Sequence, residues 1–222
     1  MKKFMAVLAS CAVLAAALAA AGCSGEQTFE AKSWSSGETA VKSVMIDVED
    51  RAVEVTASED GQVRIEYSES EKEFYNISVS ESGELTMTYE TDKSWTDFVG
   101  TKPDAQYRKI KISVPDELLS DLTIKTTNEA IDVAPLAVQS GVSLESNGGD
   151  LNFEKIDVGE SLNVTSKNGN ITGSVLGGMD DFSITCEYKK GDCNLPESKE
   201  GGSKSLKANC NNGDIDIEFI VN

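Results

Sequence analysis

The sequence of 222 residues contains no histidine, and only 6% of its residues are aromatic. The absence of histidine excludes Ser-His-Asp and Cys-His catalysis, histidine-ligated zinc and most general bases that work near neutral pH. Only four prolines are present, and signals for helices are few. No catalytic residue and no cofactor are therefore predicted, and the abundance of Val, Ile and Thr in alternating patterns indicates an all-β protein.

Positive charge is also scarce. The chain has 20 Lys and Arg against 38 Asp and Glu, which gives a formal net charge of −18. Loss of Lys2 and Lys3 with a signal peptide would bring this charge to −20. Such an acidic chain is expected to have no nucleic-acid partner and not to bind anionic lipid headgroups directly.

Residues 1–22 predict a lipoprotein signal peptide. Lys2 and Lys3 precede the apolar stretch MAVLASCAVLAAALAAA, and LAAAGC then places small residues directly before Cys23. This ending resembles a bacterial lipobox, which implies cleavage before Cys23 and attachment of diacylglycerol to its thiol. The alternatives are an ordinary secretory signal or a retained membrane helix. With a lipid on Cys23, the chain would be anchored to the membrane in the cell envelope, outside the cytoplasm.

Residues 23–40 are polar and rich in Ser and Gly, which predicts a flexible tether. The folded domain is expected over 41–222. The N-terminal half of this domain, 41–121, is irregular, but its apolar residues keep a spacing that recurs in the second half. Ile46 and Val53 are seven residues apart, as are Ile124 and Ile131. These strands are interpreted as degenerate earlier rungs.

The region 122–219 repeats itself. Apolar residues that follow a turn recur at steps of 20, 20, 22 and 22 residues. Four of them come after the turn signals SNGGDL, KNGNI, KKGDC and NNGDI. A second apolar residue lies seven positions upstream, except in the fourth copy, where Ile184 lies nine positions upstream and a longer turn is expected. The recurring residues are Ile131, Leu151, Ile171, Cys193 and Ile215.

A fixed period near 20 residues predicts stacked rungs, each with two short strands joined by a polar turn. Glycine is expected in these turns because it accepts positive φ. The predicted fold is a parallel β-solenoid in which Ile171 stacks on Cys193 and Cys193 on Ile215. A run of β-hairpins in an antiparallel β-sandwich is the alternative, because Asn-Gly is also the favoured hairpin turn.

Equivalent polar residues of the turns would stack about 4.8 Å apart. Carboxylates in such a ladder suggest weak calcium sites, because calcium takes oxygen ligands. The alternative is that each side chain binds the backbone of its own turn. No zinc site is predicted, because three cysteines without histidine match no zinc pattern. The calcium candidates are Asp150, Asp192 and Asp214, with Asn170 in the same row.

Counted back from the turns, Cys186 and Cys210 take the place of Ser146 and Ser166 in adjacent rungs. Their Cα atoms would then lie within reach of a disulfide, so a Cys186–Cys210 bridge is predicted. The alternative is that both thiols are free. Cys193 takes an apolar place and is expected in the core.

The strand YRKIKISVP, the segment DLTIKTTNEAIDV and the recurring Asn-Gly-Asp-Ile units are similar to the putative-adhesin β-strand-repeat family of bacterial envelope proteins. The resemblance covers about residues 41–220. It implies a right-handed parallel β-solenoid without an established biochemical activity.

Three functions follow as hypotheses. The first is a non-enzymatic, adhesin-like binding module at the cell surface, with an envelope protein or a glycan as its partner. The second is an accessory lipoprotein for envelope stress or signalling. The third is a carbohydrate-active enzyme, which would need carboxylates clustered in a groove.

Overall fold

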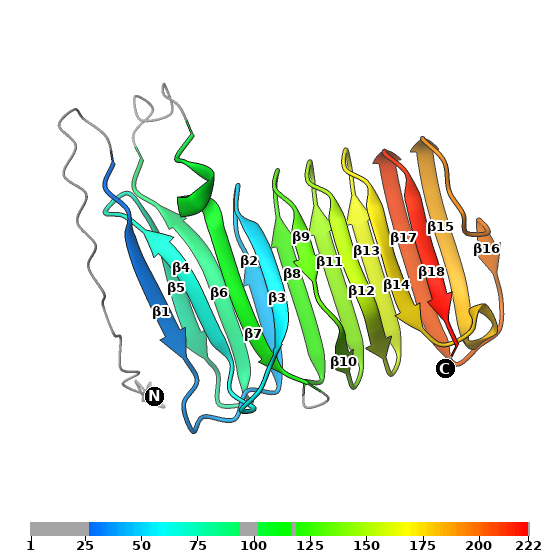
Figure 1. Cartoon of the computed structure of the whole chain (residues 1–222), viewed down its shortest axis with the longest axis horizontal. Coiled ribbons are helices and arrows are strands. Elements are labelled where there is room, and N and C mark those ends of the chain that lie inside the picture. Colours follow the sequence, from blue (N-terminus) through cyan, green and yellow to red (C-terminus); the bar gives the residue numbers. More distant parts are fainter. Residues whose placement is uncertain (1–26, 94–101, 117–118, 222) are drawn as a thin grey trace, which may run out of the picture.

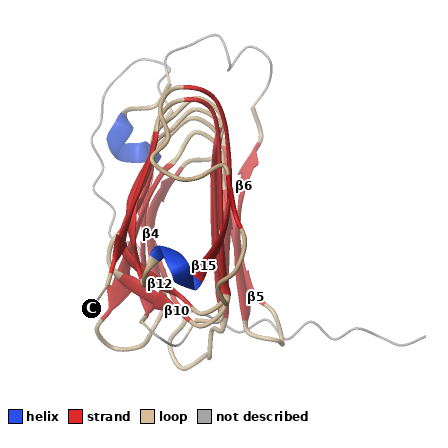
Figure 2. Cartoon of the chain, turned by 90° about the vertical axis from the view of Figure 1, so that its right-hand side faces the viewer, coloured by secondary structure: helices blue, strands red, loops and turns tan. Residues whose placement is uncertain are grey.

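The structure is a computed structural model, and it describes residues 27–93, 102–116 and 119–221. Within these residues the chain forms two facing β-sheets, which we name sheet A and sheet B (Figures 1 and 2). The helical segments described are two short 3-10 turns, η2 (Ala105–Arg108) and η3 (Met179–Asp181). None of the helical segments in this part of the chain is long and apolar enough to span a bilayer.

The strands of each sheet lie side by side in an order that differs from their order in the sequence. Across sheet A this order is β1 (Glu30–Ser35), β4 (Arg64–Glu69), β7 (Lys109–Pro115), β3 (Ala52–Ser58), β9 (Ile131–Val133), β12 (Leu151–Val158), β14 (Ile171–Leu176) and β18 (Ile215–Ile220), and β10 (Leu136–Val138) pairs with β12. Across sheet B it is β16 (Ser198–Lys199), β15 (Phe182–Lys190), β17 (Lys204–Asn212), β13 (Ser161–Ser166), β11 (Gly141–Ser146), β8 (Asp121–Thr126), β2 (Ser43–Asp47), β6 (Glu84–Thr91) and β5 (Glu73–Val79).

The predicted solenoid is confirmed. Each regular rung has a strand in sheet B, a turn and a strand in sheet A, and successive rungs pair in parallel. In sheet B, Ile124 lies opposite Leu144 and Leu144 opposite Val164. In sheet A, Leu151 lies between Ile131 and Ile171. The antiparallel sandwich is wrong for these rungs, because a hairpin array would pair the neighbouring strands in antiparallel fashion.

The core lies between the two sheets and follows from the alternation within each strand. In β8, β11 and β13 every second residue is buried, and the residues between them are mostly half-buried. Burying each Leu or Ile contributes about 1.5–3 kcal/mol. A single cluster of buried side chains therefore runs along the whole stack, from Val44 to Ile217.

The rungs at the C-terminal end do not follow the order of the sequence. Strand β17, from the last copy of the repeat, pairs with β13 on one side and with β15, from the fourth copy, on the other. The last copy therefore lies between the third and the fourth copies, and the fourth copy forms the end of the stack. In sheet A, Ile171 lies directly opposite Ile215, and Cys193 forms an isolated parallel bridge to the far side of Ile215. The predicted stacking of Ile171 on Cys193 is therefore wrong.

At the N-terminal end, too, the rungs do not follow the order of the sequence. The strands β2, β3, β6 and β7 form parallel rungs, as the interpretation of degenerate rungs expects, whereas β4 and β5 pair in antiparallel fashion. Strands β2 and β3 stack directly on the regular repeats, with Ile46 opposite Ile124 and Val53 opposite Ile131. The later strands β6 and β7 form the next rung outward. Antiparallel strands β1, β4 and β5 then close this end.

The predicted tether is wrong for part of its length. Glu30–Ser35 form strand β1, which pairs along β4, and Trp34 packs against the core. The ring of Phe29 stacks on Tyr107 with centroids 5.1 Å apart. The prediction failed because Ser and Gly suggested flexibility, whereas Phe29 and Trp34 supply the apolar surface that fixes this segment.

A buried ion pair lies beside the antiparallel strands β1, β4 and β5, which we name the N-terminal cap. Arg51 and Glu73 have side chains that are each 2% exposed, and they are in direct contact. Arg51 Nε also donates to the Tyr75 hydroxyl at 2.6 Å, and its guanidinium lies 5.0 Å from the centroid of Tyr89. Burial opposes the charge of Glu73, but hydrogen bonds from Lys93 and Arg51 outweigh it and lower its pKa.

Glycine is required in the turns for a different reason from the one predicted. Gly149, Gly169 and Gly213 do not have positive φ, and of the four predicted turns only Gly191 does, at 109°. A Cβ on Gly169 would lie 2.1 Å from the carbonyl oxygen of Gly149 in the rung below. Close stacking of the turns, rather than a left-handed backbone, therefore requires glycine there.

A buried row of side chains fixes each turn from within. Ser166 Oγ accepts from the Gly169 N–H at 2.9 Å and donates to the Gly149 carbonyl at 3.1 Å. Ser146 makes the equivalent contact with Gly149 N–H, and the Cys210 thiol donates to the Gly169 carbonyl at 3.3 Å. These side chains link each turn to the turn of the preceding rung.

Candidate functional site

A groove of about 660 Å³ crosses the outer face of sheet A. It spans strands β3, β9, β12, β14 and β18, so it runs along the axis of the stack, across the strands. One row of its lining comes from one outward-facing position of each rung, because the parallel register places these residues side by side. The row consists of Glu54, Asp132, Asn152, Thr172 and Asp216. We name it the axial groove.

The groove is lined by hydrogen-bonding and acidic groups. Asn152 Nδ2 donates to Asp132 Oδ1 at 2.8 Å, so amide and carboxylate are linked across neighbouring strands. Glu154 and Glu218 add further carboxylates, and none of the residues that line the groove is basic. The groove therefore favours a ligand that offers hydroxyl, amide or ammonium donors.

The floor of the groove is shaped by Phe153 and Gly173. These residues lie opposite each other in β12 and β14, and a Cβ on Gly173 would lie 2.3 Å from the Phe153 ring. The register then shifts between Phe153 and Ile156, where Lys155 has φ 47°. The Lys155 N–H is satisfied by Ser174 Oγ at 2.9 Å, so this bulge is a fixed feature of the surface.

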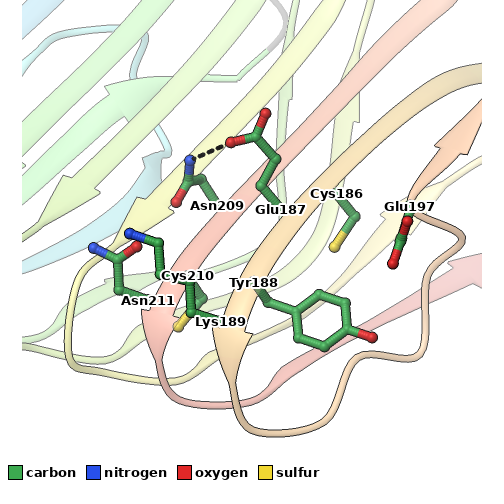
Figure 3. Close-up of a pocket in the computed structure, with 8 residues that line it drawn as sticks. All are labelled: Cys186, Glu187, Tyr188, Lys189, Glu197, Asn209, Cys210 and Asn211. Atoms are coloured by element: carbon green, nitrogen blue, oxygen red, sulfur yellow. Dashed lines mark hydrogen bonds between the residues drawn. The ribbon is translucent and has the colours of Figure 1, made fainter.

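A second cavity of about 400 Å³ lies at the C-terminal end of sheet B. Figure 3 shows its lining, which comes from β15, β17 and Glu197. Asn209 Nδ2 donates to Glu187 Oε2 at 3.3 Å. Tyr188 is 41% exposed. Cys186 and Cys210 both contribute to the wall, but Cys186 lies near Glu197 and Cys210 near Asn211.

The register does not support the predicted Cys186–Cys210 disulfide. Cys186 lies opposite Ala208, and Cys210 lies opposite Tyr188. An offset of two residues along adjacent strands separates the Cα atoms by about 8 Å, which is beyond the usual disulfide range of about 4.4–6.8 Å. The prediction assumed a longer fourth turn, whereas a constant offset of 22 residues relates β15 to β17 and also relates Cys193 to Ile215 of β18.

The predicted calcium row forms a ladder of hydrogen bonds between rungs. Asp150 Oδ1 accepts from the Asn170 N–H at 2.7 Å, and Asn170 Oδ1 accepts from the Asp214 N–H at 2.9 Å. Asp214 Oδ1 accepts in turn from the Asp192 N–H at 2.8 Å. The partners are thus backbone amides of the neighbouring rung, not of the same turn. The described ranges contain no cluster of three or more Cys, Asp or Glu side chains arranged for a metal ion.

Other predicted residues lie outside the part of the chain that the structure describes. These are the lipidation residue Cys23 and the signal peptide 1–22. Cys193 is half-buried rather than fully buried, because it lies at the end of the stack.

One residue missed by the sequence reasoning is Asn194, which protects the edge of sheet A. Its Oδ1 accepts from the Ile217 N–H and its Nδ2 donates to the Ile217 carbonyl, both at 3.0 Å. Its Nδ2 also donates to Asp216 Oδ1 at 2.7 Å. The side chain extends the pairing of β18 and so covers backbone groups that could otherwise pair with another chain. A single Asn after a turn gives no distinctive signal for this role.

Comparison with a solved structure agrees with the fold. A crystal structure of a "putative cell adhesion protein" from Clostridium sporogenes is 15% identical, with a TM-score of 0.58 over 88% of this chain and 100% of that chain. A "putative adhesin" from Bacteroides fragilis is 13% identical, with a TM-score of 0.35 over 90% of this chain and 100% of that chain. No curated protein matches the sequence. The model of the Toastrack family (DUF4097) matches residues 41–219, which confirms the family resemblance carried by the repeats, and the chain belongs to this family.

Proposed function

We propose that this protein is a lipid-anchored, non-enzymatic binding module of the cell surface that holds an extended glycan in the axial groove. The observation that carries the proposal is the register of five strands, which aligns polar side chains into one continuous row. Strands about 4.8 Å apart give this row a length of about 19 Å, which suits a ligand with repeated units.

The chemistry of the groove favours a glycan with free hydroxyl or amino groups. Carboxylates and amides accept hydrogen bonds from such groups, and an acidic lining repels sulfated or uronate-rich polymers. A peptide that adds a strand would need an open sheet edge. The axial groove instead lies on the face of sheet A.

A glycan array probed with the full chain tests this proposal. Binding is expected for neutral or amino-sugar polymers, with little binding to sulfated ones. Exchange of Asp132 and Asp216 for Lys should reduce binding at least about tenfold, because it reverses the charge of the row that contains them.

The matched control makes the same exchange on sheet B, at Glu145 and Glu187, which changes the net charge equally. This control should bind as well as the wild type. Unchanged binding by the groove variant, or equal loss in both variants, would reject the groove as the binding site.

Lipid anchoring is proposed from the segment LAAAGC and is tested separately. Cells that express the chain are labelled with a fatty acid that carries an alkyne group. Label is expected on the wild type and not on Cys23→Ala, which should also leave the membrane fraction. Equal labelling of both proteins would contradict the assignment of Cys23.

A further inference from the structure

Two residues flank the turn of every regular rung and lie seven positions apart. In the regular rungs the first lies in sheet B, two positions before the buried Thr, Ser or Cys of the turn, and the second begins the buried row of sheet A. In most rungs both are aliphatic, and they belong to the same core cluster. These pairs are Ile46–Val53, Ile124–Ile131, Leu144–Leu151, Val164–Ile171 and Ala208–Ile215.

In the terminal rung both of these positions are cysteines. Cys186 lies opposite Ala208, and Cys193 lies opposite Ile215, so the two residues are the structural equivalents of that pair. Their Sγ atoms lie 2.9 Å apart. A disulfide bond is about 2.05 Å long, so the sulfur atoms need to approach each other by less than about 1 Å.

The third cysteine is held elsewhere. Cys210 takes the place of Ser166 in the buried row inside the turns, and its thiol donates to the Gly169 carbonyl. Cys210 therefore has a separate role in its own turn.

We propose that Cys186 and Cys193 form a disulfide that fastens the terminal loop over the end of the core. This loop, 191–199, places Leu195 against the core and accepts a hydrogen bond from the Cys186 N–H at the Glu197 carbonyl, at 2.9 Å. Cys186 belongs to sheet B, whereas Cys193 pairs with β18 of sheet A. The bond joins the two sheets at the C-terminal end of the stack that the described residues form.

The reaction is a thiol–disulfide exchange, and its oxidant is a low-molecular-weight or protein disulfide. The half-buried Cys193 attacks first, as a thiolate, and forms a mixed disulfide while one thiol of the oxidant leaves. Cys186 then loses its proton and attacks the Cys193 sulfur, which releases the second thiol of the oxidant. Two protons and two electrons pass from the protein to the oxidant.

The order of attack follows from burial. Cys186 is 3% exposed. Burial, with the hydrogen bond to Cys193, raises the pKa of Cys186 to about 12, so its thiolate is rare near neutral pH. Cys193 is the more exposed of the two thiols.

Peptide mapping of the full chain tests the proposal. The chain is equilibrated with glutathione disulfide, the remaining thiols are alkylated, and the protein is digested with trypsin without reduction. Lys189 and Lys190 lie between the two cysteines, so the expected product is two peptides joined through Cys186 and Cys193. Mapping also separates these residues from Cys11 and Cys23. Alkylation of both Cys186 and Cys193, or a bond from either of them to Cys210, would overturn the proposal.

Two variants provide controls that are expected to fold, because each copies another rung. Cys210→Ser copies Ser166 and should retain the cross-link. The double variant Cys186→Val with Cys193→Ile copies Val164 and Ile171 and cannot form it. Addition of a reductant should lower the melting temperature of the wild type and of Cys210→Ser but not that of the double variant. An equal shift in all three proteins, or none in the wild type, would overturn the proposed fastening.

Discussion

Replacement of Ser166 by alanine tests whether the buried hydroxyl row holds the turns together. Ser166 is fully buried in β13, and its hydroxyl joins two backbone groups of different rungs. Alanine removes both hydrogen bonds with almost no change in shape. The Gly169 N–H and the Gly149 carbonyl then lose this partner inside the turn.

The magnitude follows from the two contacts. Each buried polar group left without a partner costs about 1–3 kcal/mol, so Ser166→Ala is expected to lower the free energy of unfolding by about 2–4 kcal/mol. Ser166→Cys should cost about half as much, because Cys210 already makes a weaker version of the same contact in the next rung, with its sulfur 3.3 Å from the Gly169 carbonyl.

Equilibrium unfolding in urea, followed by circular dichroism, measures both variants. The midpoint should fall in the order wild type, Ser166→Cys, Ser166→Ala, with little change in the slope. A loss below about 0.5 kcal/mol for Ser166→Ala would refute the role of the hydroxyl row. A cysteine variant as unstable as the alanine variant would refute it as well.

The other predictions concern the cap and the turns. The pKa of Glu73 is lowered in the folded state, so its stabilising effect is complete above the ordinary Glu value of about 4.3 and is lost as the pH falls below that value. Thermal melts should show this loss of stability for the wild type. Glu73→Gln should be less stable than the wild type by about 3–5 kcal/mol at pH 7, because Arg51 stays buried without its carboxylate. On acidification the variant should lose less stability than the wild type. Gly169→Ala should cost at least about 1–3 kcal/mol in urea unfolding, because its Cβ would lie 2.1 Å from the Gly149 carbonyl oxygen. Gly178→Ala is the control for small effects, because Gly178 has an extended backbone with φ −83° and the nearest atom to its Cβ would be 3.7 Å away. A stability profile of Glu73→Gln parallel to the wild type, or equal stability of the two glycine variants, would contradict these assignments.

The sequence was sufficient to predict the rungs, because the spacing of seven residues between paired apolar positions is a local pattern. Ile124 and Ile131 show it, and so do Ile46 and Val53 in the irregular half. The same spacing between Cys186 and Cys193 was a usable signal for their contact. The signal was missed because Ile184 was assigned to the upstream apolar position of the fourth copy, although Ile184 lies opposite Leu206.

The order of the last two rungs could not be predicted from the repeat, because both copies present the same pattern to the rung before them. The choice depends on contacts that are distant in the sequence. Phe219 of β18 packs against Phe182 with ring centroids 5.6 Å apart. The last residues of β15 are exposed, which suits a strand at the end of the stack. The axial groove also depends on this order, because Asp216 reaches its row only when β18 lies beside β14.

Cross-linking between β14 and β18 therefore tests the order of the last two rungs, and with it the axial groove, most directly. Cysteine pairs are introduced at Thr172 and Asp216, or at Thr172 and Asn194, after Cys186, Cys193 and Cys210 are replaced by Val, Ile and Ser. A short thiol-specific cross-linker should join the first pair and not the second, because Thr172 lies opposite Asp216. Cross-linking of Thr172 to Asn194 instead would place the rungs in the order of the sequence. It would contradict both the position of the last copy between the third and fourth copies and the axial groove.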